Sequence, residues 1–187
     1  SEPLPKGETP TVSANEANGP LVAVLMGSAS DKPVMERTFA VLDEFAVPYT
    51  VRILSAHRTP HATADFVERS AENGVRVFIC GAGMAAHLAG VVAAHTVRPV
   101  LAVPLESGNL GGLDALLSSV QMPGGIPVGV FAVGKAGAKN AALSAVQILA
   151  LGDEKLTAAL EDHRAAQRAK VERTDAELRA ELGQSDE

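Results

Sequence analysis

The fold is decided by the stretch LVAVLMGSASDKPVMERTFAVLDEF, residues 21–45. Its first six residues are continuously apolar, which is typical of a β-strand covered on both faces of a sheet. Ser30 and Asp31 then supply helix-capping side chains, and Pro33 suits the first turn of a helix. Apolar residues follow at helical spacing. The stretch therefore predicts a strand, a tight turn and an amphipathic helix.

The same alternation continues along the chain. Further apolar runs predict strands over residues 49–54, 75–80, 97–103 and 126–133. The intervening segments predict helices over residues 59–71, 84–94 and 112–120. Because crossovers between parallel strands are right-handed, this order predicts an α/β fold: a three-layer, doubly wound parallel sheet of five strands with flavodoxin-like topology. In such sheets, ligands bind beyond the carboxyl ends of the strands.

The two ends of the chain differ in composition from its middle. Residues 1–20 are rich in Pro, Gly, Asn and Glu and lack apolar periodicity, so we expect a flexible leader. We expect residues 21–152 to form the flavodoxin-like domain that carries the site. From residue 153 onward 16 of 35 residues are charged, which predicts a charged C-terminal helix and tail over residues 153–187.

The segment over residues 136–151 is apolar on nearly all sides. A helix of this kind is expected to be buried all round. In so small a domain, a second copy of the chain most easily covers its outer face, and the many Ala and Gly residues permit close approach. The segment therefore predicts a homo-oligomer.

The composition disfavours several classes of partner. The chain has 16 Lys and Arg against 22 Asp and Glu, for a net charge of −6, and aromatic residues make up 3%. It therefore lacks the basic field and the stacking platforms expected of a nucleic-acid binder. No apolar run approaches the length of a membrane span. The single cysteine, Cys80, lies in an apolar run, and we expect a reducing, cytoplasmic location.

The first candidate site is the loop GSASD, residues 27–31, between a predicted strand and a helix. The free amides and the dipole of a helix N-terminus favour an anion there, and the hydroxyls of Ser28 and Ser30 add hydrogen-bond donors. The carboxylate of Asp31 either caps the helix or accepts hydrogen bonds from ribose hydroxyls. An ordinary capped turn is the alternative.

The second candidate is the loop SAHRTP, residues 55–60, again between a predicted strand and a helix. Arg58 offers a planar fork that suits a phosphate. His57, which we expect to be partly shielded from water, is a candidate general base near neutral pH. His57 and His61 also have metal-ligand spacing, but Pro60 interrupts the turn and no Cys or carboxylate cluster joins them. We predict no metal.

The third candidate is the loop GAGMAAH, residues 81–87. Gly81 and Gly83 let backbone amides approach a ligand closely. The loop also matches the loose dinucleotide pattern G-x-G-x-x-A, but the true fingerprint lies in the first strand–helix unit, and the nearest acidic residue about twenty positions on, Glu106, lies beyond Pro104. A dinucleotide-binding protein is thus a weak alternative. His87 faces either the ligand or a contact between helix and sheet.

Together the loops GSASD, SAHRTP, GAGMAAHLAG and QMPGGIPVG, followed by GKAGAKNAAL, resemble the N5-carboxyaminoimidazole ribonucleotide mutases. This is the bacterial-type, class I family of purine biosynthesis, also called the catalytic subunit of phosphoribosylaminoimidazole carboxylase. The resemblance covers roughly residues 22–162. It implies a homo-octameric isomerase, without cofactor or metal, that forms 4-carboxy-5-aminoimidazole ribonucleotide by decarboxylation and recarboxylation at the ring carbon.

The resemblance also implies roles for individual residues. His57 takes the place of the family's general acid/base. Ser28, Asp31 and Arg58 correspond to its substrate contacts, with Ser30 and Ser55 as further donors. The implied partner is a small mononucleotide, together with transient contact with the enzyme that makes the carboxyamine.

The chain departs from the family pattern at Met84, Ala89 and Gly111, where Gly, Pro and Ser are usual. Met84 adds bulk beside the glycine loop and is expected to affect packing or rate rather than abolish function. One alternative is the animal-type carboxylase that uses free carbon dioxide, but its version of SAHRTP contains a lysine. The other is a phosphoacceptor signalling domain. Lys135 suits that interpretation, but Cys80 and Gly81 stand where its aspartate is needed.

Overall fold

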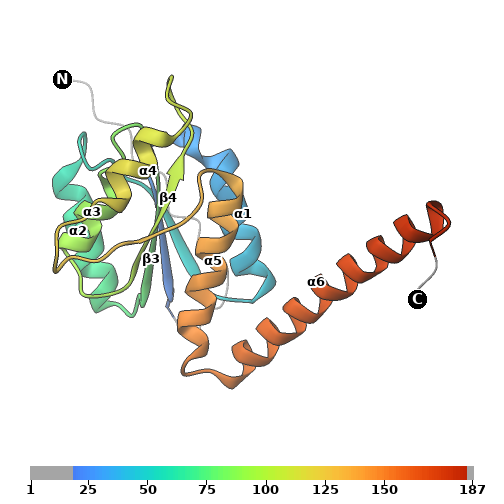
Figure 1. The fold of residues 1–187 in the computed structure, drawn as a ribbon. Coiled ribbons are helices and arrows are strands. Elements are labelled where there is room, and N and C mark those ends of the chain that lie inside the picture. Colours follow the sequence, from blue (N-terminus) through green and yellow to red (C-terminus); the bar gives the residue numbers. More distant parts are fainter. Residues whose placement is uncertain (1–18, 185–187) are drawn as a thin grey trace, which may run out of the picture. The chain divides into compact units, whose positions relative to one another are not determined.

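The computed structural model describes residues 19–184 (Figure 1). Nearly all of the leader predicted over residues 1–20, and the last three residues of the predicted tail, lie outside the described residues. The chain divides into two compact units between Ile148 and Leu149. The division of the chain at residues 20 and 152 stays a prediction.

The first unit contains a parallel sheet whose five strands are ordered β2-β1-β3-β4-β5. This order is the flavodoxin-like topology predicted from the alternation of strands and helices, and the prediction is confirmed. The strands are β1 (Val22–Met26), β2 (Tyr49–Ile53), β3 (Val77–Gly83), β4 (Val100–Leu105) and β5 (Gly129–Val130).

Helices cover both faces of the sheet. In Figure 1, α2 (Pro60–Glu72) and α3 (Leu88–Ala94) lie on one side of the strands, and α1 (Lys32–Glu44) and α5 (Lys135–Ala150) lie on the other. The hydroxyl of Thr38 in α1 donates a buried hydrogen bond of 2.9 Å to the carbonyl oxygen of Ala138 in α5. A short helix, α4 (Leu113–Val120), follows β4.

The core explains why the strands are apolar on consecutive residues. Every residue of β1 is buried, and so are all six residues of β4. The side chains of Phe78 and Leu25 are among the largest that are fully buried. Burial of apolar area, at about 25 cal/mol per Å², is the main force that holds such a sandwich together.

Two element boundaries differ from their predictions for local reasons. The strand predicted over residues 126–133 is reduced to Gly129 and Val130 at the sheet edge, where β4 is its one neighbour and Pro127 offers no N–H for a ladder. The helix predicted over residues 84–94 begins at Leu88, because Met84 has a φ of 55°, which no right-handed helix accommodates.

Within the single chain, the segment over residues 136–151 is not buried on every side, and cover of its outer face by a second copy stays a prediction. One side of α5 is fully buried, whereas Lys139, Asn140 and Gln147 are exposed. Leu151, just after the helix, is 89% exposed. The polar residues recur at helical spacing, so they form a stripe that faces away from the sheet. The apolar content of the segment hid this stripe.

The second unit contains α6 (Glu154–Glu181), as the charged C-terminal segment predicted. Asp153 caps the helix, since its side chain accepts hydrogen bonds from the backbone N–H groups of Lys155 and Leu156. None of the described helices combines the length and the apolar character that a bilayer span requires.

Candidate active site at three loops

Three loops meet at the carboxyl edge of the sheet because β1 lies between β2 and β3. The N–H of Leu54, after β2, donates to the carbonyl oxygen of Met26 at 2.8 Å. The N–H of Gly27, after β1, donates to the carbonyl oxygen of Gly81 at 3.2 Å. These bonds hold the starts of the loops side by side, so all three predicted loops contribute to one place on the molecule.

The loop after β1 is a capped turn in which the hydroxyl hydrogen of Ser28 is not used by the bonds within the turn. The backbone N–H of Ser28 donates to Oδ2 of Asp31 at 2.9 Å. The Oγ of Ser28 accepts from the N–H of Ser30 at 3.3 Å and from the hydroxyl of Ser30 at 2.9 Å. The hydroxyl hydrogen of Ser30 is thus used within the loop. Because Ser28 acts as an acceptor in both bonds, its own hydroxyl hydrogen can donate to a ligand.

Asp31 is half-buried beneath this turn. Burial raises the pKa of its carboxyl group above the usual value, and the N–H groups of Ser28 and Gly27 and the charge of Arg58 oppose part of that rise. The carboxylate of Asp31 closes the turn by accepting the N–H of Ser28, but it makes no cap hydrogen bond at the start of α1, so the predicted cap of that helix is wrong. Contact with ribose hydroxyls stays a prediction.

The loop after β2 reaches across to the loop after β1. The Nη2 atom of Arg58 donates to the carbonyl oxygen of Gly27 at 3.0 Å. The Oγ of Ser55 accepts from the N–H of Arg58 at 3.2 Å, and the N–H of Ser55 donates to Oγ1 of Thr59 at 2.9 Å. Ser55 thus shapes the loop that carries Arg58. Its hydroxyl hydrogen is free to donate, as the prediction for it requires.

His57 contacts a second histidine, from the loop after β3. Its Nε2 atom lies 2.8 Å from Nδ1 of His87. The two rings are nearly perpendicular, at 84°, with their centroids 4.9 Å apart. One nitrogen of the contact must carry a hydrogen and the other must accept it, so the tautomers of the two rings are coupled.

The sequence left the direction of His87 open, and the structure turns it toward His57 rather than into the interface of helix and sheet. The sequence already indicated that His87 could face the site, because His87 follows β3, and β3 neighbours β1 in the predicted strand order. The expectation that His57 is shielded from water is not met within the single chain, since both rings are exposed.

The two glycines of the third loop, Gly81 and Gly83, lie against close neighbours. A Cβ at Gly83 would collide with Oγ of Ser107 and lie 3.1 Å from the carbonyl oxygen of Leu105. A Cβ at Gly81 would lie 2.6 Å from Sδ of Met35. A side chain at either position would therefore force a neighbouring side chain to shift. Contact between the amide of Gly83 and a ligand stays a prediction.

Residues 21–170 match the model of a family described as AIR carboxylase. The chain belongs to the AIR carboxylase family. It is 50% identical over 145 residues to the N5-carboxyaminoimidazole ribonucleotide mutase of Bacillus subtilis, across 78% of this chain and 90% of that protein. It is 52% identical over 150 residues to the protein of that name from Escherichia coli, across 80% and 89% of the two chains. The resemblance seen in the loops is confirmed.

Two solved structures from Treponema denticola are similar to this AIR carboxylase family member in fold. The structure titled PurE has a TM-score of 0.77 and 31% identity, and it covers 85% of this chain and 98% of its own. The structure of a PurE2 variant has a TM-score of 0.78 and 29% identity, with coverages of 86% and 98%. The family assignment favours an enzyme over the signalling-domain and dinucleotide-binding alternatives.

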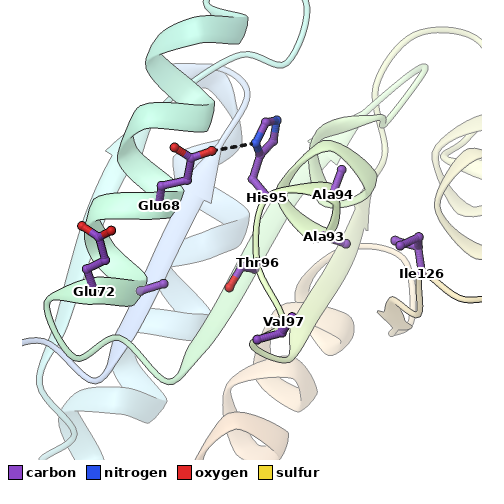
Figure 2. A pocket seen from close by; sticks show the side chains of 9 residues that line it. Glu68, Glu72, Ala93, Ala94, His95, Thr96, Val97 and Ile126 are labelled. Carbon is purple, nitrogen blue, oxygen red and sulfur yellow. Dashed lines mark hydrogen bonds and ion pairs between the residues drawn. The ribbon is translucent and has the colours of Figure 1, made fainter.

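A hollow of about 560 Å³ lies elsewhere on this AIR carboxylase family member (Figure 2). It lies at the carboxyl ends of α2 and α3 and is lined by Glu68, Ala71, Glu72, residues 93–97 and Ile126. In it, Nδ1 of His95 lies 3.0 Å from Oε1 of Glu68. Crossover helices run back along the strands, so this hollow lies at the amino edge of the sheet, away from the three loops. Among the described residues, no group of three metal-ligating side chains comes together.

Proposed function

We propose that this chain converts N5-carboxyaminoimidazole ribonucleotide to 4-carboxy-5-aminoimidazole ribonucleotide, the activity for which its relatives from Bacillus subtilis and Escherichia coli are named. The observation that carries the proposal is the contact between His57 and His87, directly beside the turn that presents Ser28 and the guanidinium of Arg58. An imidazole pair next to an anion site is what a proton transfer on a bound nucleotide needs.

The loop after β1 and Arg58 hold the nucleotide in this proposal. The hydroxyl hydrogen of Ser28 and the guanidinium of Arg58 donate to the phosphate, and Asp31 accepts from the ribose hydroxyls. Arg58 keeps its bond to the carbonyl oxygen of Gly27, which fixes the guanidinium across the turn. A net charge of −6 disfavours a polyanion but permits a mononucleotide held by a few fixed donors.

Two further residues complete the proposed contacts, and a third supports them. Ser55 donates its remaining hydroxyl hydrogen, Ser30 fixes the hydroxyl of Ser28, and Gly83 presents a backbone amide. Each belongs to one of the three strand ends that meet at the site. The ligand would therefore touch all three loops at once, which gives it one orientation.

His57 moves the proton in the proposed reaction. The bond from the exocyclic nitrogen to the carboxylate breaks, carbon dioxide leaves, and the nitrogen takes up a proton. The ring carbon then forms a bond to that carbon dioxide, and His57 removes the proton that this carbon carried, which restores aromaticity. One proton is taken up and one is released, so the reaction is an isomerisation. It transfers no electrons, and we propose that it needs neither cofactor nor metal.

We further propose a homo-oligomer, with the octamer that the family resemblance implies. Three leucine and valine side chains on one face of α4 are exposed: Leu113 by 56%, Leu117 by 51% and Val120 by 48%. Their spacing of four and three residues makes one continuous apolar stripe. The site itself is open to water in the single chain, whereas released carbon dioxide must be retained. A second copy of the chain packed over this edge would bury the apolar stripe of α4 and would also close the site to water.

The remaining proposals follow from the reaction. The protein would act in the cytoplasm on a small mononucleotide, in transient contact with the enzyme that makes the carboxyamine. Neither nucleic acid nor a membrane is a proposed partner.

A comparison of two substrates tests the function. Purified protein receives the carboxyamine in one reaction and the bare aminoimidazole ribonucleotide with bicarbonate in the other, and product is followed by absorbance. Rapid product in the first reaction alone supports the mutase. Efficient product from low bicarbonate in the second would contradict it and favour the animal-type carboxylase. The His57→Asn variant, assayed in parallel, corrects for the nonenzymatic loss of the carboxyamine.

A further inference from the structure

The loop between β3 and α3, residues 84–87, carries His87 but belongs to no regular element. It begins at Met84, whose φ of 55° turns the chain away from the strand direction. It ends in a tight turn in which the N–H of His87 donates to the carbonyl oxygen of Ala85 at 2.8 Å. The direction of the imidazole therefore depends on what holds this short loop in place.

A serine of α4 holds the loop from the side. The Oγ of Ser118 accepts the N–H of Ala86 at 2.9 Å. Its own hydrogen is directed to the carbonyl oxygen of Asp114, one turn back in the helix, at 2.8 Å. The carbonyl oxygen of Met84 is also within reach, at 3.5 Å. One hydroxyl thus joins α4 to the residue that immediately precedes His87.

The adjacent serine provides a contrast. The hydroxyl of Ser119 donates to the carbonyl oxygen of Ala115 at 2.8 Å, and it lies 3.5 Å from the carbonyl oxygen of Ala86. It accepts no N–H from the loop in these bonds. Ala86 is 3% exposed, so its N–H has no ready access to water. Removal of the Ser118 hydroxyl would therefore leave a buried donor without an acceptor, whereas removal of the Ser119 hydroxyl would not.

We propose that Ser118 is a positioning residue that acts through His87. By fixing the peptide N–H of Ala86, it holds the imidazole of His87 at hydrogen-bond distance from His57. The contact of 2.8 Å leaves little slack, because a shift of about 1 Å takes two nitrogens out of hydrogen-bond range. The hydrogen bonds of Ser118 go to the loop and to its own helix, and Ser118 is not among the proposed ligand contacts. The kinetic tests of this inference rest on the proposed function, whereas the NMR test of the contact between His57 and His87 does not.

The kinetic test compares Ser118→Ala with the matched control Ser119→Ala. We expect Ser118→Ala to lower kcat roughly 10-fold or more with little change in KM, and to alter the pH dependence of kcat. Ser119→Ala should stay within about twofold of the parent. Ser118→Thr, which restores the hydroxyl, should recover most of kcat. Equal losses in both alanine variants, or no recovery with threonine, would show that Ser118 is merely structural.

A double variant tests whether the effect passes through His87. In a His87→Ala background, Ser118→Ala should cause no further loss of kcat, because the group that it positions is gone. Additive losses would overturn the inference. If Ser118→Ala does not fold, Ser118→Cys serves in its place. It keeps the side-chain volume but accepts hydrogen bonds weakly, so an unaltered kcat in that variant would also overturn the inference.

An NMR measurement without substrate separates this inference from the proposed function. The imidazole nitrogen and proton signals of ¹⁵N-labelled histidine are recorded at one fixed pH. In the parent, a hydrogen-bond signal should connect Nε2 of His57 with Nδ1 of His87, and Ser118→Ala should abolish it while Ser119→Ala leaves it unchanged. A hydrogen-bond signal that survives in Ser118→Ala would refute the positioning role. This readout holds even if the protein proves inactive as a mutase.

Discussion

The Nε2 atom of His57 lies 2.8 Å from the Nδ1 atom of His87, although 30 residues separate the two histidines in the chain. The pair forms because β2 and β3 flank β1, so that the loops after them lie on either side of the same turn. One hydrogen serves both nitrogens, and a change in the protonation of one ring changes the hydrogen bond offered to the other. A proton acceptor in this place is what the proposed reaction uses.

Replacement of His57 by Asn should abolish turnover and leave the fold intact. The ring is exposed, so its loss creates no cavity, whereas a proton shuttle of this kind contributes roughly 10²- to 10⁴-fold. Turnover of the carboxyamine and circular dichroism measure the two effects. A variant with near-normal turnover would refute the acid/base assignment.

Replacement of His87 by Ala should lower kcat by about tenfold or more and shift the pH optimum, because His57 loses its hydrogen-bond partner. His95→Ala is a matched control, since its imidazole pairs with Glu68 in the hollow at the opposite edge of the sheet. The pH dependence of kcat for both variants provides the check. An effect of equal size in the control would argue against the pair.

Replacement of Arg58 by Lys should raise KM by about tenfold with a smaller effect on kcat. A lysine keeps the charge but loses the planar fork and its fixed bond to the carbonyl oxygen of Gly27. Arg52→Lys, in β2, alters a guanidinium that lies 5.2 Å from the ring centroid of Phe66, and it should leave KM unchanged. Initial rates over a range of substrate concentrations distinguish the two variants.

Replacement of Asp31 by Asn should change how stability depends on pH. Burial raises the folded-state pKa of this carboxyl from its ordinary value of 3.8, so the folded protein holds the proton more tightly than the unfolded chain. The stability that Asp31 contributes is therefore present below pH 3.8 and is lost as the pH rises through the higher folded value. The amide oxygen of asparagine can still accept the N–H of Ser28, but asparagine does not titrate.

The free energy of unfolding of Asp31→Asn, relative to the parent, should thus rise across that window. Urea denaturation at a series of pH values measures it. A constant difference, or one that falls with increasing pH, would show that Asp31 is not penalised by burial. At neutral pH the variant should also bind substrate more weakly, if Asp31 accepts from the ribose.

Replacement of Gly81 by Ala should destabilise the fold by about 1–3 kcal/mol. The new Cβ would lie 2.6 Å from Sδ and 3.0 Å from Cγ of Met35, and that side chain is fully buried, so it must shift within the core. Gly152→Ala serves as the control, since a Cβ there meets nothing within 4 Å. Urea denaturation of both variants gives the comparison. Equal stabilities would mean that β3 and α1 are packed more loosely than described.

The sequence was sufficient to predict the sheet because buried parallel strands consist of consecutive apolar residues, as in Val22–Met26. The stripe of Lys139, Asn140 and Gln147 on α5 was missed because many small apolar residues mask a few polar ones. The brevity of β5 was missed because whether a strand lies at a sheet edge is a property of the assembled sheet.

The candidate site was predictable as a set of loops but not as a set of contacts. Ser28, His57 and Arg58 are recognisable by their chemical type and by their place after a strand. The partner of His57 is not, because the direction of His87 is set by the left-handed turn at Met84 and by a serine 31 positions further along the chain. Spacing along a sequence carries no information about such turns.

The position of β1 between β2 and β3 has a consequence for how the chain folds. The imidazole pair cannot form until both flanking strands are in place, nor stay aligned until α4, which ends at Val120, has docked on the loop that carries His87. These are distant pairings along the chain, which form slowly. Recovery of turnover after dilution from denaturant would thus report the last steps of sheet assembly rather than early collapse.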